Sequence, residues 1–127
     1  MLPTRLNPSP PAPDRKRVRS SQIVVFNGVA KFTCTPHRPY QPGVDIAEQT
    51  RQLLARADER LKAINAGRDA IISAFIAISD ASHFDGMNEV WDDWIDPDHA
   101  PSRMCVVTKF AKEHIKVEMV FTAAAQP

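Results

Sequence analysis

Cysteine is scarce in this chain, which has two in 127 residues. Cys34 and Cys105 are too few for a disulfide framework, and neither belongs to a CxxC metal pair. This usage favours a reducing compartment, and we expect a cytoplasmic protein. The four histidines show no HxH or HExxH spacing and no glycine-rich phosphate loop is present, so we expect neither a metal nor a cofactor.

Long apolar runs are also absent. No segment approaches the roughly 20 apolar residues of a membrane helix, and the N-terminus lacks the apolar core of a signal peptide. We therefore expect a soluble protein that does not contact a membrane. Residues 1–19 carry five basic residues and one acidic residue, a net charge of +4 in a chain whose total is +1. The remaining −3 argues against nucleic-acid binding by the rest of the chain.

The N-terminal segment is rich in proline, with five in the first 13 residues. Because proline disfavours helix and sheet interiors, we expect residues 1–19 to form a mobile or loosely docked basic arm that folding does not need. A chain of this length holds one core, so residues 20–127 are expected to form a single domain.

Hydrophobic patterns predict seven elements. In chain order they are strands 22–26 and 29–34, a helix from Asp45 to before Gly67, a strand at 70–79, a helix at 82–95, and strands 103–108 and 115–123. Asn27-Gly28 favours a hairpin between the first two strands. The order ββαβαββ indicates an α+β domain with a mixed sheet and both helices on one face. Strand 70–79 is apolar on both sides, so the uncovered face is expected to pack against other copies of the chain.

Two charged residues stand out in the last two strands. Arg103 lies at the start of an apolar strand just after Pro101, and its planar fork suits a carboxylate held by two hydrogen bonds. Glu118 is a lone carboxylate among apolar residues and is the natural second half of a site. The alternative is that the two pair only with each other or with the rim of the domain.

Four stretches carry a resemblance to a known family. They are Thr50-Arg51-Gln52, residues 78–84 (ISDASHF), residues 87–91 (MNEVW), and residues 100–105 (APSRMC) followed by 116–119 (KVEM). In this order and spacing, residues 20–123 resemble the small Rid proteins, also called the YjgF or endoribonuclease-type translation-inhibitor family, and look nearest to the YoaB-like subgroup. The resemblance implies a chorismate-mutase-like fold and a homotrimer whose sheets enclose a barrel, with sites between subunits. It also implies hydrolysis of reactive enamines and imines to 2-keto acids and ammonia.

The resemblance also implies roles for individual residues. Arg103 matches the arginine that grips the substrate carboxylate, and Glu118 matches the acid that positions or activates water. Asn88 and Cys105 match positions that line the same cleft. From the residues alone, Asn88 fits a helix-surface or capping role equally well, and Cys105 fits a small buried apolar residue.

The chain departs from the family pattern at two places. Members carry Ser-Gly or Cys-Gly at the end of the second strand, where this chain has Thr33-Cys34, and Ser20-Ser21 stand where deaminases have an aromatic residue. Cys34 is therefore a further expected substrate-contacting position, at which a Cβ would intrude on the ligand. This leaves a carboxylate sensor without turnover as an alternative. A ribonuclease would need a basic groove with stacking aromatics, which the acidic body lacks.

Overall fold

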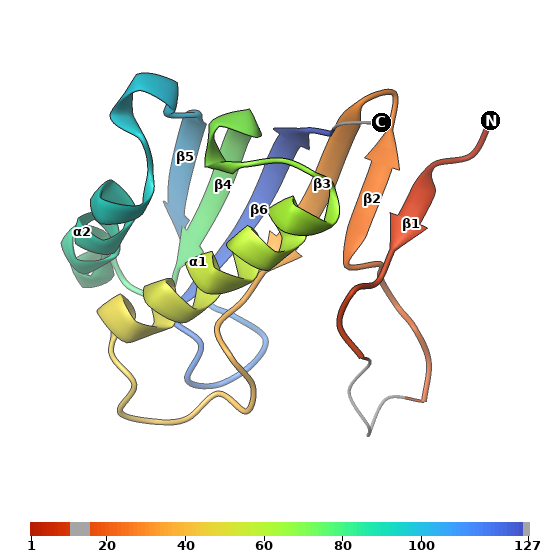
Figure 1. Ribbon diagram of the computed structural model, residues 1–127. Coiled ribbons are helices and arrows are strands. Elements are labelled where there is room, and N and C mark those ends of the chain that lie inside the picture. The colour runs from red at the N-terminus through yellow and green to blue at the C-terminus, as the bar shows by residue number, and fades with distance from the viewer. Residues whose placement is uncertain (11–15, 126–127) are drawn as a thin grey trace.

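The computed structural model describes residues 1–10 and 16–125, so residues 11–15 of the expected arm lie outside the described part (Figure 1). One mixed sheet has the strand order β1-β2-β3-β6-β4-β5. Its strands are β1 (Thr4–Leu6), β2 (Ile23–Phe26), β3 (Val29–Cys34), β4 (Ile71–Ile78), β5 (Ser102–Val107) and β6 (Val117–Ala124). The two α-helices are α1 (Ile46–Ala63) and α2 (Phe84–Trp94), and short 3-10 helices lie at Arg68–Ala70, Ala81–His83 and Pro97–His99.

The predicted hairpin is confirmed. Asn27 and Gly28 join β2 to β3 with φ angles of 51° and 74°, the positive values that a tight two-residue turn requires. Along β3 the side chains alternate, so that Ala30, Phe32 and Cys34 are buried and the residues between them are exposed. This alternation fixes which face of the hairpin meets the core.

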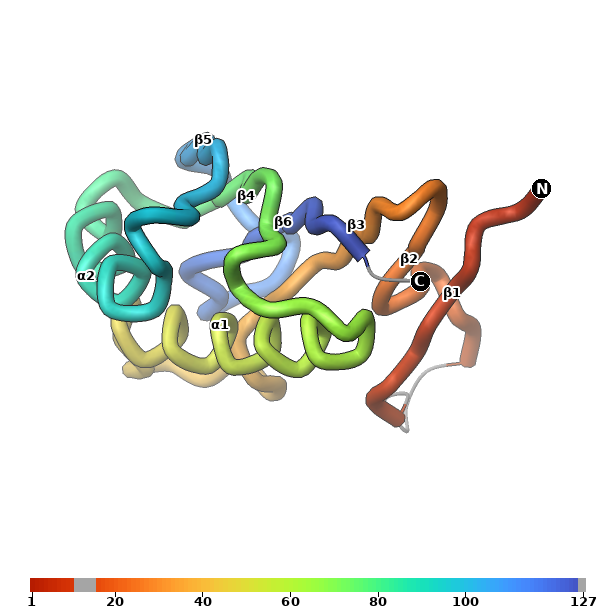
Figure 2. The backbone as a smooth tube through the Cα atoms, turned by 45° about the horizontal axis from the view of Figure 1, so that its top comes forward, coloured from red at the N-terminus to blue at the C-terminus, as the bar shows by residue number. Residues whose placement is uncertain are grey.

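Both helices cover the same face of the sheet (Figures 1 and 2). The Asp45 carboxylate accepts a hydrogen bond of 2.8 Å from the Glu48 amide and so caps α1, as the sequence predicts. α1 then buries an apolar stripe that includes Leu53, Leu54 and Leu61. The α+β architecture with two helices on one sheet face is therefore confirmed.

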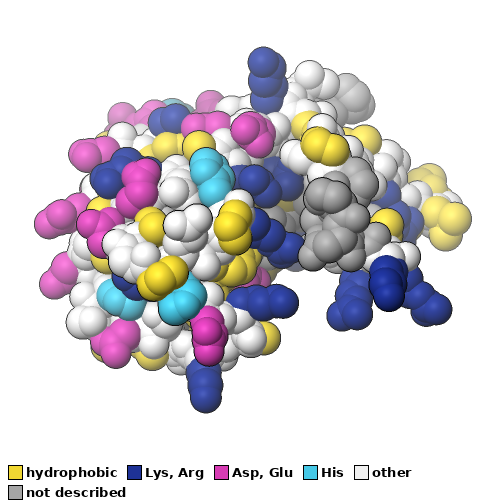
Figure 3. All heavy atoms as spheres, turned by 90° about the horizontal axis from the view of Figure 1, so that it is seen from below, with side chains coloured by type: hydrophobic (Ala, Val, Ile, Leu, Met, Phe, Trp, Pro, Cys, Tyr) yellow, Lys and Arg dark blue, Asp and Glu magenta, His cyan; other side chains and the backbone are white. Residues whose placement is uncertain are grey.

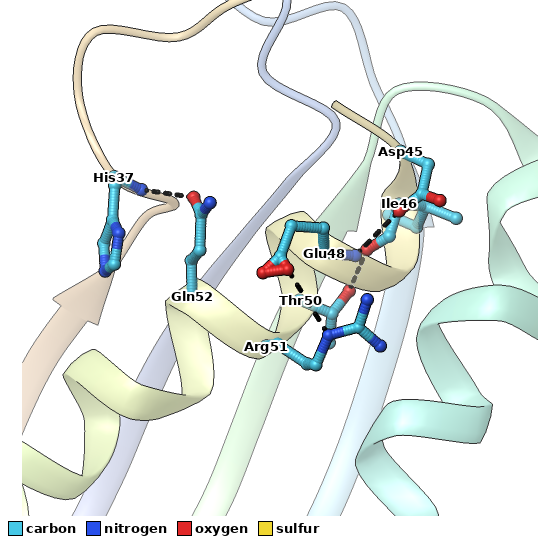
Figure 4. Close-up of polar contacts among 7 residues, drawn as sticks. All are labelled: His37, Asp45, Ile46, Glu48, Thr50, Arg51 and Gln52. Carbon is cyan, nitrogen blue, oxygen red and sulfur yellow. Dashed lines mark hydrogen bonds and ion pairs between the residues drawn. The ribbon is translucent and has the colours of Figure 1, made fainter. Parts of the chain in front are cut away.

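The Thr50-Arg51-Gln52 stretch organises the start of α1 (Figure 4). The buried Thr50 hydroxyl donates a 2.7 Å hydrogen bond to the carbonyl of Ile46. The Gln52 side chain accepts a 3.0 Å bond from the His37 amide and so tethers the β3–α1 loop. Arg51 points to solvent and pairs with Glu48 at 3.4 Å. Two residues of this stretch therefore serve local structure.

In the described part of the chain, no helix covers the other face of the sheet. Phe75 on β4 is 46% exposed and Met104 on β5 is 58% exposed, and Val120 on β6 is also exposed beside them. Strand β4 is thus apolar on both sides, as expected, with one side covered by the helices and the other open in a single chain. We call this surface, formed by Phe75, Met104 and Val120, the open sheet face.

The structure contains one strand, β1, that the sequence patterns do not predict. It pairs antiparallel with β2, with Arg5 opposite Val24, and so extends the sheet by one edge strand. The Ser9 amide donates to the Gln22 side chain at 3.0 Å, and Gln22 donates back to the Ser9 carbonyl at 2.9 Å. The buried Arg60 of α1 donates to the same Gln22 oxygen at 3.0 Å. Residues 4–9 are therefore docked, and the division of the chain at residue 19 remains a prediction.

Two smaller points complete the fold. The second helix begins at Phe84 instead of Ser82, because Asp80 caps a 3-10 turn at Ala81–His83 with its carboxylate accepting from the Ser82 amide. Within residues 1–10 and 16–125, no helix is both long enough and apolar enough to cross a membrane.

Candidate functional site

Arg103 lies on β5 at the edge of the sheet, opposite Ala74 of β4. Its Nη2 donates a 2.7 Å hydrogen bond to Asn88 Oδ1, and the guanidinium carbon lies 5.2 Å from the centre of the Trp91 ring. Both partners belong to α2. The second helix therefore holds the arginine side chain from one side, by a hydrogen bond and by a cation–π contact.

Local structure explains why these partners meet Arg103. Asn88 and Trp91 are three residues apart on α2, so they lie on the same side of that helix. Trp91 is 4% exposed and stacks on Phe121 of β6, with parallel rings (3°) and centroids 6.4 Å apart. Phe121 is itself opposite Ala74, so Arg103 stands at the margin of the aromatic core.

Glu118 lies on β6, opposite Ala77 of β4, and is half-buried. Burial raises the pKa of this carboxyl because it disfavours the charged form, and the positive charge of Arg38 in the β3–α1 loop opposes that rise. A carboxyl with a raised pKa exchanges a proton more readily near neutral pH, which suits acid–base work.

Arg103 and Glu118 do not meet within one chain. Their partners on β4, Ala74 and Ala77, are three residues apart, and successive side chains of a strand point to opposite faces. Arg103 therefore lies on the helix face and Glu118 on the open sheet face, with their Cα positions about 14 Å apart by strand spacing and rise. Among the described residues no ion pair joins the two.

The structure places the two cysteines in one row across the helix face of the sheet. The row runs from Cys34 through Met119 and Ile76 to Cys105, so the cysteines are separated by about three strand spacings, or roughly 14 Å. Burial raises the pKa of the Cys34 thiol to about 12, against the opposing charges of Arg60 and Arg56. Burial likewise raises the pKa of the Cys105 thiol, against the charge of Arg103. Neither thiol is set up as a nucleophile.

Apart from Glu118 on the open sheet face, the expected site residues fall into two groups. Arg103, Asn88 and Cys105 gather on the helix face at the β5 end of the sheet, where Cys105 follows Arg103 by two residues. Cys34 lies under α1, with its side chain fully buried in the core. Its Cβ points away from solvent, so any ligand contact at this position would involve the backbone.

A hollow that the sequence did not predict lies beside the β3–α1 loop. It encloses about 290 Å³ and is lined by Pro36, His37, Arg38, Pro39, Tyr40, Gln41, Val44, Gln49 and Gln52. Arg38 lies over the Tyr40 ring at 5.8 Å and is the basic residue that acts on Glu118. The feature of the sequence that could have indicated this hollow is Arg38, a lone arginine in a proline-rich loop directly after a strand.

Charge is unevenly spread over the end of the molecule where this loop lies. Figure 3 shows that end from below, with Lys and Arg side chains near its middle around a hollowed region. Acidic side chains gather on the side where Figure 1 places α2. Within the described part of the chain, no group of three or more His, Cys, Asp or Glu is arranged to hold a metal ion.

Comparison with known proteins gives consistent matches. Residues 8–125 match the model of the family described as Endoribonuclease L-PSP. A RutC family protein of Haemophilus ducreyi is 32% identical over 106 residues, which is 84% of this chain and 89% of that protein. The RutC family protein YoaB of Escherichia coli K12 is also 32% identical over 106 residues, covering 84% and 90%. A YjgF family structure from Neisseria meningitidis superimposes with a TM-score of 0.79 at 28% identity, covering 88% and 92%.

Proposed function

The chain belongs to the Endoribonuclease L-PSP family, the YjgF or Rid proteins, and on that basis we propose that it hydrolyses reactive enamines and imines to 2-keto acids and ammonia. The observation that carries the proposal is the state of Arg103. Its guanidinium is held by Asn88 and Trp91, and among the described residues no carboxylate pairs with it. A half-buried arginine fixed in this way is suited to an external anion.

The proposed chemistry needs few groups. Arg103 binds the carboxylate of an imino acid through its remaining N–H groups and so fixes the position of the imine carbon. A water molecule adds to that carbon, and cleavage of the C–N bond then releases ammonia and the keto acid. Glu118 orients the water, takes up its protons in turn and passes them to the nitrogen that leaves as ammonia, a role that its raised pKa supports.

This mechanism requires more than one copy of the chain. Because Arg103 and Glu118 lie on opposite faces of the same sheet, they can share a ligand only across a subunit interface. We propose a homotrimer in which Arg103 of one subunit faces Glu118 of its neighbour. The exposed apolar residues of the open sheet face support such an assembly.

The test is a panel of freshly generated imines, assayed for ammonia and keto acid with wild type and Arg103→Ala. We expect wild type to accelerate hydrolysis of carboxylated imines and Arg103→Ala to lose most of that activity. Arg51→Ala is the matched control, because Arg51 is an exposed arginine of α1 that pairs with Glu48. Wild-type protein that accelerates none of the imines would refute the proposed activity.

A second candidate is a regulatory protein that binds small carboxylates without turnover. It is favoured by the separation of Arg103 from Glu118 on opposite faces of the sheet, because Arg103 can bind a carboxylate without Glu118. Calorimetric binding of pyruvate through Arg103 without imine hydrolysis would identify this function. The ribonuclease activity in the family's name would require salt-dependent RNA binding, which the acidic α2 side of the molecule does not favour.

A further inference from the structure

We propose that Trp91 is a positioning residue of the site, whose ring holds the Arg103 guanidinium in the orientation that binds a carboxylate. The inference rests on the proposed role of Arg103 as the carboxylate ligand. Its starting point is the 5.2 Å distance between the guanidinium carbon and the centre of the Trp91 ring. The family resemblance implies that Asn88 lines the same cleft and gives Trp91 no role at the site.

Two contacts are needed to hold the Arg103 guanidinium in one position and one orientation. The 2.7 Å hydrogen bond from Nη2 to Asn88 Oδ1 fixes one nitrogen but leaves rotation about that contact. An aromatic ring beside the guanidinium restricts this rotation, because the planar cation gains most when it lies over the ring. Together the two contacts define both the place and the plane of the group.

The Trp91 ring is itself held in place. It is 4% exposed, stacks with parallel rings on Phe121, and lies 5.7 Å from the centre of Trp94. A side chain packed on several sides in a core has no room to change rotamer. Arg103 therefore rests on a rigid aromatic surface that extends from the interior of the domain.

Trp94 provides a matched control. It belongs to the same helix and the same aromatic cluster, at 6.4 Å from Phe121. Its polar contacts are different, because its indole nitrogen donates to Asp58 at 3.2 Å and Arg68 lies over its ring at 4.8 Å. Substitution of Trp94 should therefore disturb the same aromatic cluster while leaving the ring that contacts Arg103 in place.

The experiment compares Trp91→Leu and Trp91→Phe with Trp94→Leu and Trp94→Phe, using pyruvate as the probe in calorimetric titrations. Trp91→Leu should raise the Kd for pyruvate about tenfold and Trp91→Phe about threefold, since a smaller ring keeps part of the cation–π contact. KM for carboxylated imines should rise by the same factors with kcat nearly unchanged, because the contact serves bound substrate and transition state alike. Both Trp94 variants should bind pyruvate within twofold of wild type.

The results separate this inference from the proposed activity. An unchanged Kd for the Trp91 variants, an equal rise in the Trp94 variants, or a wild type that does not bind pyruvate would overturn the role of Trp91. If Trp91→Leu does not fold, Trp91→Phe decides, and an unchanged Kd in that variant overturns the inference. Absence of imine turnover in a wild type that binds pyruvate would refute the enzymatic activity alone, and the Kd values would still decide the role of Trp91.

Discussion

Arg103 and Glu118 differ in what surrounds them. Arg103 has a hydrogen-bond acceptor and an aromatic ring beside it, both from α2. Glu118 is half-buried on the opposite face, where the charge that acts on it comes from Arg38 in a loop. Substitution of each residue should therefore produce a different kinetic result.

Arg103→Lys should lower kcat/KM on carboxylated imines ten- to a hundredfold while leaving the fold intact. Lysine keeps the charge but cannot form the bidentate contact, a loss of about 1.5–3 kcal/mol. Steady-state kinetics with unchanged circular dichroism would confirm this. Full activity in Arg103→Lys would mean that substrate binding does not depend on a bidentate contact with the Arg103 guanidinium.

Glu118→Gln should reduce kcat while leaving pyruvate affinity close to that of wild type. A group that orients water and accepts its proton acts mainly in the transition state, so its loss appears in kcat. The measurement is the imine assay combined with calorimetric binding. A selective rise in KM would instead make Glu118 a substrate-binding residue.

Glu118 should also affect how stability depends on pH. Its folded-state pKa is raised by burial, so its contribution to stability is fully present below the unfolded pKa and is lost as pH rises through the folded pKa. Glutamine does not ionise. The unfolding free energy of Glu118→Gln minus that of wild type should therefore be larger at pH 7 than at pH 3.5. Urea denaturation at both pH values measures this.

Glu113→Gln serves as the control for that comparison, because the Glu113 side chain is 92% exposed. Its unfolding free energy should follow that of wild type at both pH values. If the difference in unfolding free energy between Glu118→Gln and wild type were the same at both pH values, burial would not raise the pKa of Glu118.

At the scale of elements, the hairpin, both helices and the three later strands β4, β5 and β6 could be predicted because each carries a local signal. Asn27-Gly28 specifies a turn, and Asp45 specifies a helix start. Strand β1 has no such signal, since its three residues are too few to show a period of two. The separation of Arg103 from Glu118 depends on strand register, and no local pattern encodes which residues of β4 lie opposite them.

The docking of β1 changes what is expected of the N-terminal segment. Deletion of residues 1–9 should lower Tm by several degrees, because it removes the pairing with β2 and the bonds of Gln22 with Ser9. It would also expose Arg60, which donates to Gln22 and to Ser9. Thermal unfolding of the shortened and full-length proteins tests this.

Arg60→Met provides the companion variant in both backgrounds. If Arg60 couples the segment to α1, the effects of the deletion and of Arg60→Met should be less than additive. An unchanged Tm after deletion would restore the expectation of a dispensable arm.

At the scale of the whole molecule, the open sheet face exposes the apolar side chains of Phe75, Met104 and Val120. Phe75→Glu should shift the proposed homotrimer toward monomers, because it places a charge in the middle of the face that the proposed assembly would bury. Analytical ultracentrifugation at micromolar concentration measures the mass. Lys62→Glu is the control, since Lys62 is an exposed residue of α1, which covers the opposite face of the sheet. A monomeric wild type would contradict the assembly, and with it the shared site.

The position of β6 constrains how the sheet is completed during synthesis. β6 is the last strand in the sequence, yet it lies in the middle of the sheet and pairs with both β3 and β4. Until residues 117–124 have left the ribosome, the strands β1-β2-β3 and the parallel pair β4-β5 have no shared partner and form two separate halves. Each half exposes an unpaired edge in the meantime. A nascent chain stalled before Val117 should therefore be digested by protease, and protection should arise in a single step once β6 emerges.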